Sequence, residues 1–227
     1  MISQRFNAVV FDLDGTLIDS EPDLRAALNK TLAESGRASV TRPQVVKMIG
    51  DGVPKLVERG FDATGGPPVD GLEAAVKRFS ANYEGHTSAL SEVFPGVPAA
   101  LAELKRQGLR LGVCTNKPQK PTEEILADFG LAGLIDAAVG GDALGGVRKP
   151  DGRHLAAVLE KLDAAPDRAV MVGDNHNDAG VARALGVPFV AVSFGYARGT
   201  VAELEADRVI HHFRELAAAL AALAGAA

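Results

Sequence analysis

Several features common in other protein classes are missing from this 227-residue sequence. It contains one cysteine, Cys114, so no disulfide bond can form within the chain, and we expect this residue to be part of the buried core. The longest uncharged apolar stretch, residues 216–227, is too short to cross a bilayer. No apolar segment follows a basic start at the N-terminus, so we expect no signal peptide. These absences predict a cytoplasmic protein that does not bind a membrane.

An excess of positive charge is also missing, because the formal net charge is −5. We therefore expect no nucleic-acid partner, although a local group of cations can still attract a small anionic substrate. The sequence has neither the GxxxxGK(S/T) pattern of a phosphate-binding loop nor the GxSxG pattern of a serine nucleophile. Chemistry based on either of those motifs is not expected.

The sequence does contain short apolar runs of strand length, and the later ones alternate with helical patterns. The runs cover residues 7–11, 109–115, 135–139, 169–172 and 188–193, with a weaker one at 208–211. Continuous apolar strands that alternate with helices are typical of a parallel sheet covered on both faces. We therefore predict an α/β fold with a doubly wound parallel sheet.

Residues 18–92 have a different pattern, with no strand-like run. Apolar residues at helical spacing form stripes in residues 24–32 and 72–83, and residues 41–44 resemble a capping box at a helix start. We predict that an α-helical domain is inserted after the first strand of the α/β core. The predicted boundaries are 18–92 for the insert and 1–17 with 93–227 for the core.

Polar side chains follow four of the predicted strands at the point where each strand ends. In an open parallel sheet these ends lie along one edge, and ligands bind there. We therefore expect carboxylates, hydroxyls, an amide and a lysine to meet at this edge. They follow the first strand (Asp12, Asp14, Gly15 and Thr16), the second (Thr115 and Asn116), the third (Lys149) and the fourth (Asp174 and Asp178).

Asp12 and Asp14 are the least expected of these residues, because two carboxylates at one strand end repel each other. A hard cation such as Mg²⁺ removes the repulsion, since it prefers oxygen ligands and usually binds one or two carboxylates. Lysine, threonine and asparagine side chains are suitable donors for a phosphoryl group. In isolation each residue also fits a structural role, such as a turn at Asp14 or a helix cap at Asp174. Together they predict Mg²⁺ and a small anionic phosphorylated metabolite as ligands.

The same residues occur in four short motifs: FDLDGTLIDS at 11–20, TN at 115–116, KP at 149–150 and VGDNHND at 172–178. In this order they resemble the motifs of the haloacid dehalogenase (HAD) superfamily in its phosphatase form. The resemblance implies a Rossmann-like core with a small helical cap between the first two motifs, which matches the predicted insert. The third motif commonly continues as KPxP, whereas this sequence reads KPDGRHL.

Four further stretches resemble one subfamily, the bacterial phosphoglycolate phosphatases. They are IGDG at 49–52, TNKP at 115–118, VGGD at 139–142 and FGYARG at 194–199. This resemblance implies 2-phosphoglycolate as the preferred substrate. Because the motif residues all serve the phosphoryl group, we expect the cap segment 47–55 to select the alcohol. Lys47, Lys55 or Arg42 is available there to offset a substrate carboxylate.

The HAD resemblance also implies a role for each motif residue. Asp12 is the nucleophile that forms an aspartyl-phosphate, and Asp14 is first the general acid and then the general base. The Asp12 carboxylate, the Asp14 backbone carbonyl and Asp174 hold Mg²⁺. The remaining residues serve the phosphoryl group: Thr115, Asn116 and Lys149 bind its oxygens, Asp178 orients Lys149 or a metal-bound water, and Gly15 and Thr16 support the first motif.

Other functions fit part of the same pattern. A related phosphatase or phosphomutase acting on a sugar phosphate, pyrophosphate or nucleotide would use the same core residues. A dehalogenase needs no acid at Asp14, and a phosphonate hydrolase needs a Schiff-base lysine in the cap, for which Lys30, Lys47 and Lys55 are candidates. A phospho-acceptor signalling domain explains neither the cap nor Asp14. The sequence is compatible with a monomer or a homodimer.

Overall fold

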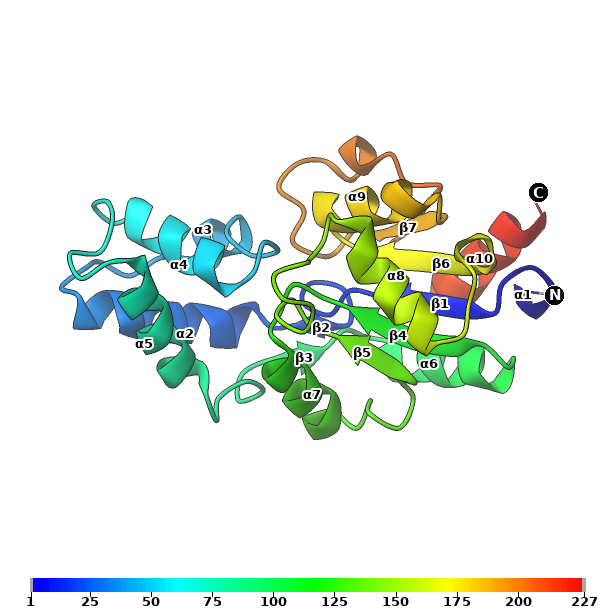
Figure 1. The fold of residues 1–227 in the computed structure, drawn as a ribbon, viewed down its shortest axis with the longest axis horizontal. Coiled ribbons are helices and arrows are strands. Elements are labelled where there is room, and N and C mark those ends of the chain that lie inside the picture. The colour runs from blue at the N-terminus through cyan, green and yellow to red at the C-terminus, as the bar shows by residue number, and fades with distance from the viewer. Residues whose placement is uncertain (1, 226–227) are drawn as a thin grey trace.

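A six-stranded parallel sheet forms the centre of the computed structural model, which describes residues 2–225 (Figure 1). The strand order is β5-β4-β1-β6-β7-β8, and every neighbouring pair is parallel. Each apolar run that we predicted to be a strand forms one, so the predicted α/β fold is confirmed. The strands are β1 (Ala8–Phe11), β4 (Arg110–Cys114), β5 (Ala137–Val139), β6 (Ala169–Gly173), β7 (Phe189–Val192) and β8 (Arg208–Ile210).

Helices cover both faces of the sheet because alternate strand residues point to opposite sides. Val9 and Phe11 belong to the apolar cluster on one face, whereas Ala8 and Val10 belong to the cluster on the other. Cys114 lies in the second cluster as a buried core residue, and burial raises the pKa of its thiol to about 12. The first face packs against α1 (Ile2–Arg5), α6 (Val97–Arg106), α7 (Gln119–Asp128) and α10 (Leu216–Gly225), and the second against α8 (Gly152–Lys161) and α9 (His176–Leu185).

The position of β1 inside the sheet creates a crevice at one edge. The chain adds β4 and β5 on one side of β1 and then β6, β7 and β8 on the other. Where the direction of winding changes in this way, the carboxyl ends of the central strands border a ligand-binding crevice. Figure 1 shows the inserted helices beyond this edge of the sheet.

The insert is a bundle of four helices with an apolar core of its own. Leucines at intervals of four residues place one stripe of α2 against α4 and α5. Leu28, Phe61 and Phe79, one from each of these helices, are fully buried. We call this bundle the cap; its helices are α2 (Glu21–Glu34), α3 (Arg42–Val46), α4 (Val53–Asp62) and α5 (Leu72–Tyr83).

Two very short strands join the cap to the core. β2 (Ile18–Asp19) and β3 (Glu92–Val93) pair in an antiparallel manner, with Ile18 opposite Val93. We expected no strand within residues 18–92, and that expectation was wrong. Two-residue strands are too short to produce a periodic pattern, so the sequence gives no signal for them.

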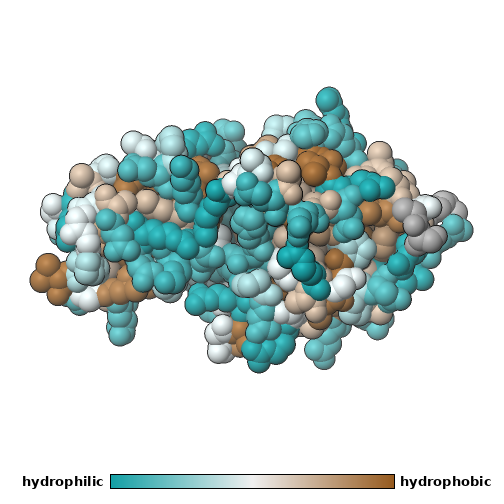
Figure 2. Space-filling model, turned by 90° about the horizontal axis from the view of Figure 1, so that it is seen from above, coloured by the Kyte–Doolittle hydropathy of each residue, from teal (hydrophilic) through white to brown (hydrophobic). Residues whose placement is uncertain are grey.

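The face of the molecule seen in Figure 2 is largely hydrophilic. Hydrophilic side chains cover most of this face, and hydrophobic ones form small separate groups. Within residues 2–225, no helix combines the length and the apolar character needed to cross a membrane. Three short 3₁₀ helices complete the described elements: η1 (Pro166–Arg168), η2 (Val201–Leu204) and η3 (Phe213–Glu215).

Candidate active site

The first motif leaves β1 as a tight loop that fixes Asp12 between neighbouring strands. The Asp12 backbone N–H donates to the carbonyl of Val172, and its Oδ1 accepts from the Leu13 N–H at 2.7 Å. Gly15 follows with a φ of 84°, a left-handed conformation that favours glycine. A Cβ at Gly15 would also lie only 2.4 Å from Asp174 Oδ2. The glycine therefore lets the first motif approach the acid of the fourth motif closely.

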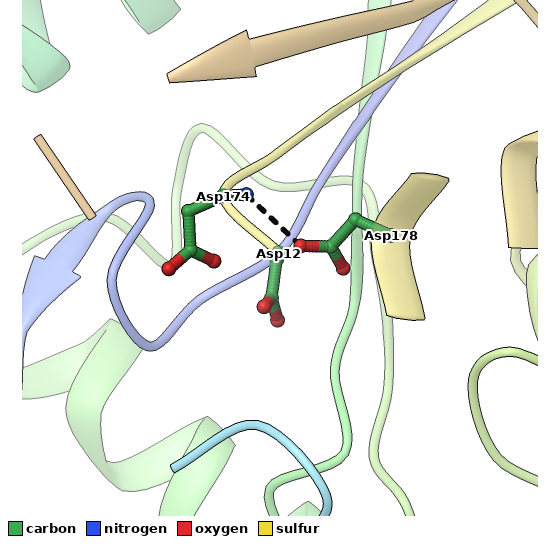
Figure 3. Close-up of side chains that lie close together, drawn as sticks. All are labelled: Asp12, Asp174 and Asp178. Atoms are coloured by element: carbon green, nitrogen blue, oxygen red, sulfur yellow. Dashed lines mark hydrogen bonds between the residues drawn. The ribbon is translucent and has the colours of Figure 1, made fainter. Parts of the chain in front are cut away.

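Three carboxylates from two strand ends meet in a buried cluster. Ligand atoms of Asp12, Asp174 and Asp178 lie within 4.8 Å of one another, and Figure 3 shows the three side chains close together. Burial and the Asp178 charge raise the pKa of Asp12 to about 7, against the opposing effect of Lys149. Burial, Asp178 and Asp12 also raise the pKa of Asp174 well above its ordinary value. Such a cluster is stabilised by a cation.

Lys149 supplies part of that positive charge. Its Nζ lies 2.8 Å from Asp12 Oδ1 and 2.6 Å from Asp178 Oδ1, and all three side chains are almost fully buried. Burial disfavours its ammonium form, but Asp12 and Asp178 outweigh this effect and raise the pKa of Lys149. The other Asp178 oxygen accepts from the backbone N–H groups of Asp174 and Asn175. Of the two roles expected for Asp178, the structure therefore shows the contact with Lys149.

Asp174 has the surroundings of a metal ligand rather than of a paired acid. Its Oδ2 accepts from the Tyr196 N–H at 2.5 Å, and its Oδ1 accepts from Asn175 Nδ2 at 3.0 Å and from Thr16 Oγ1 at 3.4 Å. Neutral donors orient this carboxylate without neutralising it. Both oxygens of Asp178 already have close donors, Lys149 for one and two backbone N–H groups for the other. Asp12 keeps one oxygen whose only donor is Asn175 Nδ2 at 3.5 Å, so Asp12 and Asp174 are the carboxylates left for a cation. Two carboxylates in a set of oxygen donors suit a divalent metal such as Mg²⁺.

A buried histidine holds the backbone of Lys149 in place. The Lys149 N–H donates to His154 Nδ1 at 3.0 Å, and His154 Nε2 lies 3.1 Å from the carbonyl of Val139. Burial and the charge of Lys149 lower the pKa of His154 to about 4. In the KPDGRHL stretch, α8 begins directly after the third motif, and Asp151 caps it by accepting from the Arg153 N–H. Lys149 thus keeps its place although the second proline is missing.

The second motif is shared between the core and the cap. Thr115 Oγ1 accepts from the Lys117 N–H at 3.2 Å. The Asn116 side-chain amide donates to the carbonyls of Gly50 at 2.9 Å and Lys149 at 3.0 Å. Both amide protons are therefore engaged, whereas the Asn116 backbone N–H donates to no acceptor within residues 2–225. In this arrangement the backbone group is the donor that Asn116 has available for a phosphoryl oxygen.

Lys117 and Tyr83 are site residues to which the sequence analysis gave no role. Lys117 Nζ lies 3.1 Å from Asp14 Oδ1 and 2.8 Å from the Tyr83 hydroxyl oxygen, and it sits 4.8 Å from the centre of the Tyr83 ring. Burial opposes the charge, but Asp14 and Tyr83 outweigh it and raise the pKa of Lys117. Ser20, beside the cap junction, also donates to Asp14 at 2.6 Å. A signal for Lys117 existed in the TNKP stretch, whereas Tyr83 looked only like part of an apolar helix face.

The Gly50–Asp51 loop fastens the cap to the core. Asp51 pairs with Arg59 of the cap at 2.6 Å and accepts from Asn177 of the core at 2.6 Å. It also pairs with Arg198, which donates to the carbonyl of Ile49 at 2.7 Å. Burial opposes ionisation, but these donors outweigh it and lower the pKa of Asp51 to about 2. Arg198, from the FGYARG stretch of the core, therefore lies at the boundary between cap and core.

A cavity lies between the cap and the strand ends. Its volume is about 30 Å³, which is room for about two water molecules. A phosphate ester needs more room than this, so the cap and the core must move apart for a substrate to enter. The core lines it with Asp12, Asp14, Thr115, Asn116, Lys117 and Pro118, and the cap lines it with Leu24, Ile49, Gly50, Gly52, Val53, Leu56 and Tyr83.

The basic residues that we expected to offset a substrate carboxylate do not line this cavity. Lys47 is exposed, Lys55 pairs with Glu58 on the surface, and Arg42 pairs with Asp19 and Glu21. That expectation was wrong because α3 and α4 turn these long side chains outward. Of the predicted segment 47–55, the apolar and glycine residues face the cavity.

The comparisons with known proteins agree with this fold and this set of motifs. The model of the haloacid dehalogenase-like hydrolase family matches residues 9–192. The chain therefore belongs to the haloacid dehalogenase-like hydrolases, and within that family it is a phosphatase. The phosphoglycolate phosphatase of Rhodospirillum rubrum is 45% identical to it over 214 residues, covering 92% of this chain and 88% of that protein.

Solved structures have the same architecture. A predicted phosphoglycolate phosphatase from Haemophilus somnus superposes with a TM-score of 0.89 at 29% sequence identity, covering 94% of this chain and 97% of that one. CbbY from Rhodobacter sphaeroides, crystallised in complex with phosphate, superposes with a TM-score of 0.79 at 25% identity, covering 95% and 99%. The core and the cap are thus both shared with proteins of this family.

Proposed function

We propose that this phosphatase hydrolyses 2-phosphoglycolate to glycolate and phosphate in a Mg²⁺-dependent reaction. The observation that carries the proposal is that Asp12 and Asp14 line one cavity, with Asp12 positioned by Lys149 and the Leu13 N–H. The 45% identity to a phosphoglycolate phosphatase over most of both chains supports the choice of substrate.

In the first step the Asp12 carboxylate attacks phosphorus and forms an aspartyl-phosphate. The bond between phosphorus and the ester oxygen breaks, and Asp14 gives its proton to the departing glycolate oxygen. Lys149, the Thr115 hydroxyl and the Asn116 backbone N–H bind the phosphoryl oxygens, and these fixed donors stabilise the charge of the transition state. Ser20 and Lys117 hold Asp14 beside the cavity for this transfer.

In the second step water attacks the phosphorus of the aspartyl-phosphate. Asp14, now deprotonated, takes the proton from that water, and the bond between phosphorus and the Asp12 oxygen breaks. Phosphate leaves and the Asp12 carboxylate is restored. The closed cap limits the water that reaches the intermediate, because the cavity has little spare volume.

Mg²⁺ is the metal that the donor set fits best. The Asp12 carboxylate, Asp174 and the Asp14 backbone carbonyl would hold it, and it would neutralise charge on the carboxylates and on the phosphoryl group. Lys149 alone leaves this cluster negative, since it faces both Asp12 and Asp178 while Asp174 has only neutral donors. This negative charge supports a further cation at the cluster.

The substrate is tested by comparing kcat/KM for 2-phosphoglycolate with the values for glycerol phosphate, glucose 6-phosphate, pyrophosphate and nucleoside monophosphates. We expect the highest value for 2-phosphoglycolate. If another ester exceeds it by tenfold, which corresponds to roughly 1.4 kcal/mol of transition-state discrimination, the substrate is different although the phosphatase chemistry stands.

A further inference from the structure

Lys117 is the only cation among the described residues that line the cavity. It comes from the core, directly after the second motif, and its ammonium group touches Tyr83 at the end of cap helix α5. Both side chains are almost fully buried. We propose that Lys117 and Tyr83 bind the carboxylate of the substrate and thereby select for it. This inference rests on the proposed function, because it concerns the part of the substrate that is not the phosphate.

The hydrogen bonds of this pair leave two donors available. The Lys117 ammonium has three N–H groups and contacts two partners, Asp14 and the Tyr83 oxygen. The Tyr83 hydroxyl accepts from Lys117, and its own proton has no acceptor within the described chain. A buried donor without a partner is unfavourable, so both free donors favour an anionic group in the cavity. A carboxylate has two oxygens and can accept from both.

The rest of the cavity makes this pair the place where an anion is recognised away from the phosphate. The other cap residues that line it are leucines, isoleucine, valine and glycines, which offer no side-chain donor. The motif residues Lys149 and Thr115 belong to the phosphoryl end. The bridge between Lys117 and Asp14 brings this second anion site next to the acid that serves the leaving oxygen, as a two-carbon substrate requires.

The pair also links substrate recognition to closure of the cap. Lys117 is carried by the core and Tyr83 by the cap, so the two donors face one ligand only when the two domains are together. A ligand that contacts both domains binds the closed state more tightly than the open one and shifts the population toward it. A substrate with a carboxylate would therefore promote closure, whereas an alkyl phosphate would not.

The test compares 2-phosphoglycolate with ethyl phosphate, which has the same two-carbon length and no carboxylate. Lys117→Met keeps the aliphatic stem without the charge, and Tyr83→Phe keeps the ring without the hydroxyl. Lys120→Met is the matched control, because Lys120 is an exposed lysine nearby that pairs with Glu84 of the cap and does not line the cavity. The readout is the change that each substitution makes in kcat/KM for each ester, so intrinsic differences between the esters cancel.

We expect Lys117→Met to lower the ratio of kcat/KM for 2-phosphoglycolate over ethyl phosphate by about 10- to 100-fold, and Tyr83→Phe to lower it by about 5- to 10-fold. Lys120→Met should leave the ratio unchanged. Equal losses for both esters would show that Lys117 acts only on Asp14 or on the fold, and would overturn the inference. Tyr83→Phe removes no contact of Asp14, so it is an independent test. An unchanged ratio in this variant would also overturn the inference.

Failure of the inference is distinguishable from failure of the proposed function. A wild-type enzyme that hydrolyses both esters equally well, with variants that leave the ratio unchanged, would remain a phosphatase without this carboxylate site. A wild-type enzyme that hydrolyses neither ester in the presence of Mg²⁺ would overturn the proposed function and this inference together.

Discussion

The core and cap sides of the cavity differ in chemistry and in what holds their side chains in place. On the core side, buried charges such as Asp12 and Lys149 are held by strand ends and by short hydrogen bonds. On the cap side the lining is apolar apart from Tyr83, and it is positioned by helices that carry their own core. In the proposed mechanism the reaction depends on the core, while the cap contributes shape and one hydroxyl.

The strongest test of this division is Asp12→Asn, which keeps the shape of the side chain and removes its charge. We expect kcat to fall on the order of 10³-fold or more for every phosphate ester, because the covalent route is lost. Turnover of several esters, measured with protein free of deamidation, checks this. Asp167→Asn, an exposed acid outside the cavity, should leave kcat unchanged. Near-normal turnover by Asp12→Asn would assign the nucleophile elsewhere.

Metal removal tests the core side again. EDTA should abolish activity, Mg²⁺ should restore it, and Ca²⁺ should replace it poorly because its coordination is looser. Asp174→Asn should raise the Mg²⁺ concentration for half-maximal activity by about 100-fold, since losing even a supporting partner costs 10- to 100-fold. Titrations of activity with Mg²⁺ give both values. Full activity in chelator, or an unchanged Mg²⁺ requirement in Asp174→Asn, would contradict the metal assignment.

The pH dependence of stability tests whether folded His154 stays neutral and accepts the hydrogen bond from the Lys149 N–H. The pKa of His154 is lowered from 6.5 in the unfolded chain to about 4 in the folded one. As pH falls below 6.5 the unfolded chain therefore takes up the proton first, and the stability contributed by neutral His154 is lost progressively toward pH 4. We expect a loss of about 2 kcal/mol in the free energy of unfolding between pH 7.5 and pH 5.

Urea unfolding at several pH values measures this loss, and His154→Gln is the comparison because it does not titrate. The difference between the two proteins isolates His154 from the carboxylates, which also lose stability in acid. If both proteins lose stability in parallel, His154 is already able to accept a proton when folded. The N–H of Lys149 would then have another acceptor than His154 Nδ1.

The smallest expected effect concerns the cap side. Asp51→Ala removes the pairs with Arg59 and Arg198 and the acceptor for Asn177. Partly exposed ion pairs contribute modestly, so we expect kcat/KM to fall about 3- to 10-fold, mainly through KM. The loss should be equal for 2-phosphoglycolate and ethyl phosphate, in contrast to Lys117→Met.

Glu58→Gln is the control for Asp51→Ala, because the Lys55–Glu58 pair lies within the cap and does not reach the core. It should leave kcat/KM unchanged. A selective loss for one ester in Asp51→Ala would show that Asp51 recognises the substrate. The assignment of Asp51 to closure of the cap, and of Tyr83 to substrate selection, would then be wrong.

Much of the core could be predicted from the sequence because its signals are local. Each strand is a continuous apolar run, since both faces of the parallel sheet are buried. The rule that ligands bind at the carboxyl ends then brought Asp12, Lys149 and Asp174 together without further information. The contact between Lys149 and Asp178 was implied by the resemblance to the haloacid dehalogenase motifs, and the structure shows it at 2.6 Å.

The missing parts depend on contacts that no local pattern encodes. Tyr83 has the spacing of an ordinary buried aromatic residue. Its hydroxyl contacts Lys117 only because α5 packs beside the second motif in the folded chain. The outward direction of Lys55 depends on how α4 packs on α2, which periodicity alone does not fix. Asp51 seemed a loop residue between glycines, and its partner Arg198 is 147 positions away along the chain.

The antiparallel pair β2–β3 places the entry and exit of the cap side by side, with Ile18 opposite Val93. Partners in such a pair have Cα atoms about 5 Å apart. The inserted bundle therefore joins two adjacent points of the core, as the loop of a hairpin does. Lengthening, shortening or exchanging that loop leaves the strand order and the strand ends of the sheet intact. The chain is therefore modular for engineering, provided that a grafted cap restores the contacts that Asn116 and Lys117 make with the present one.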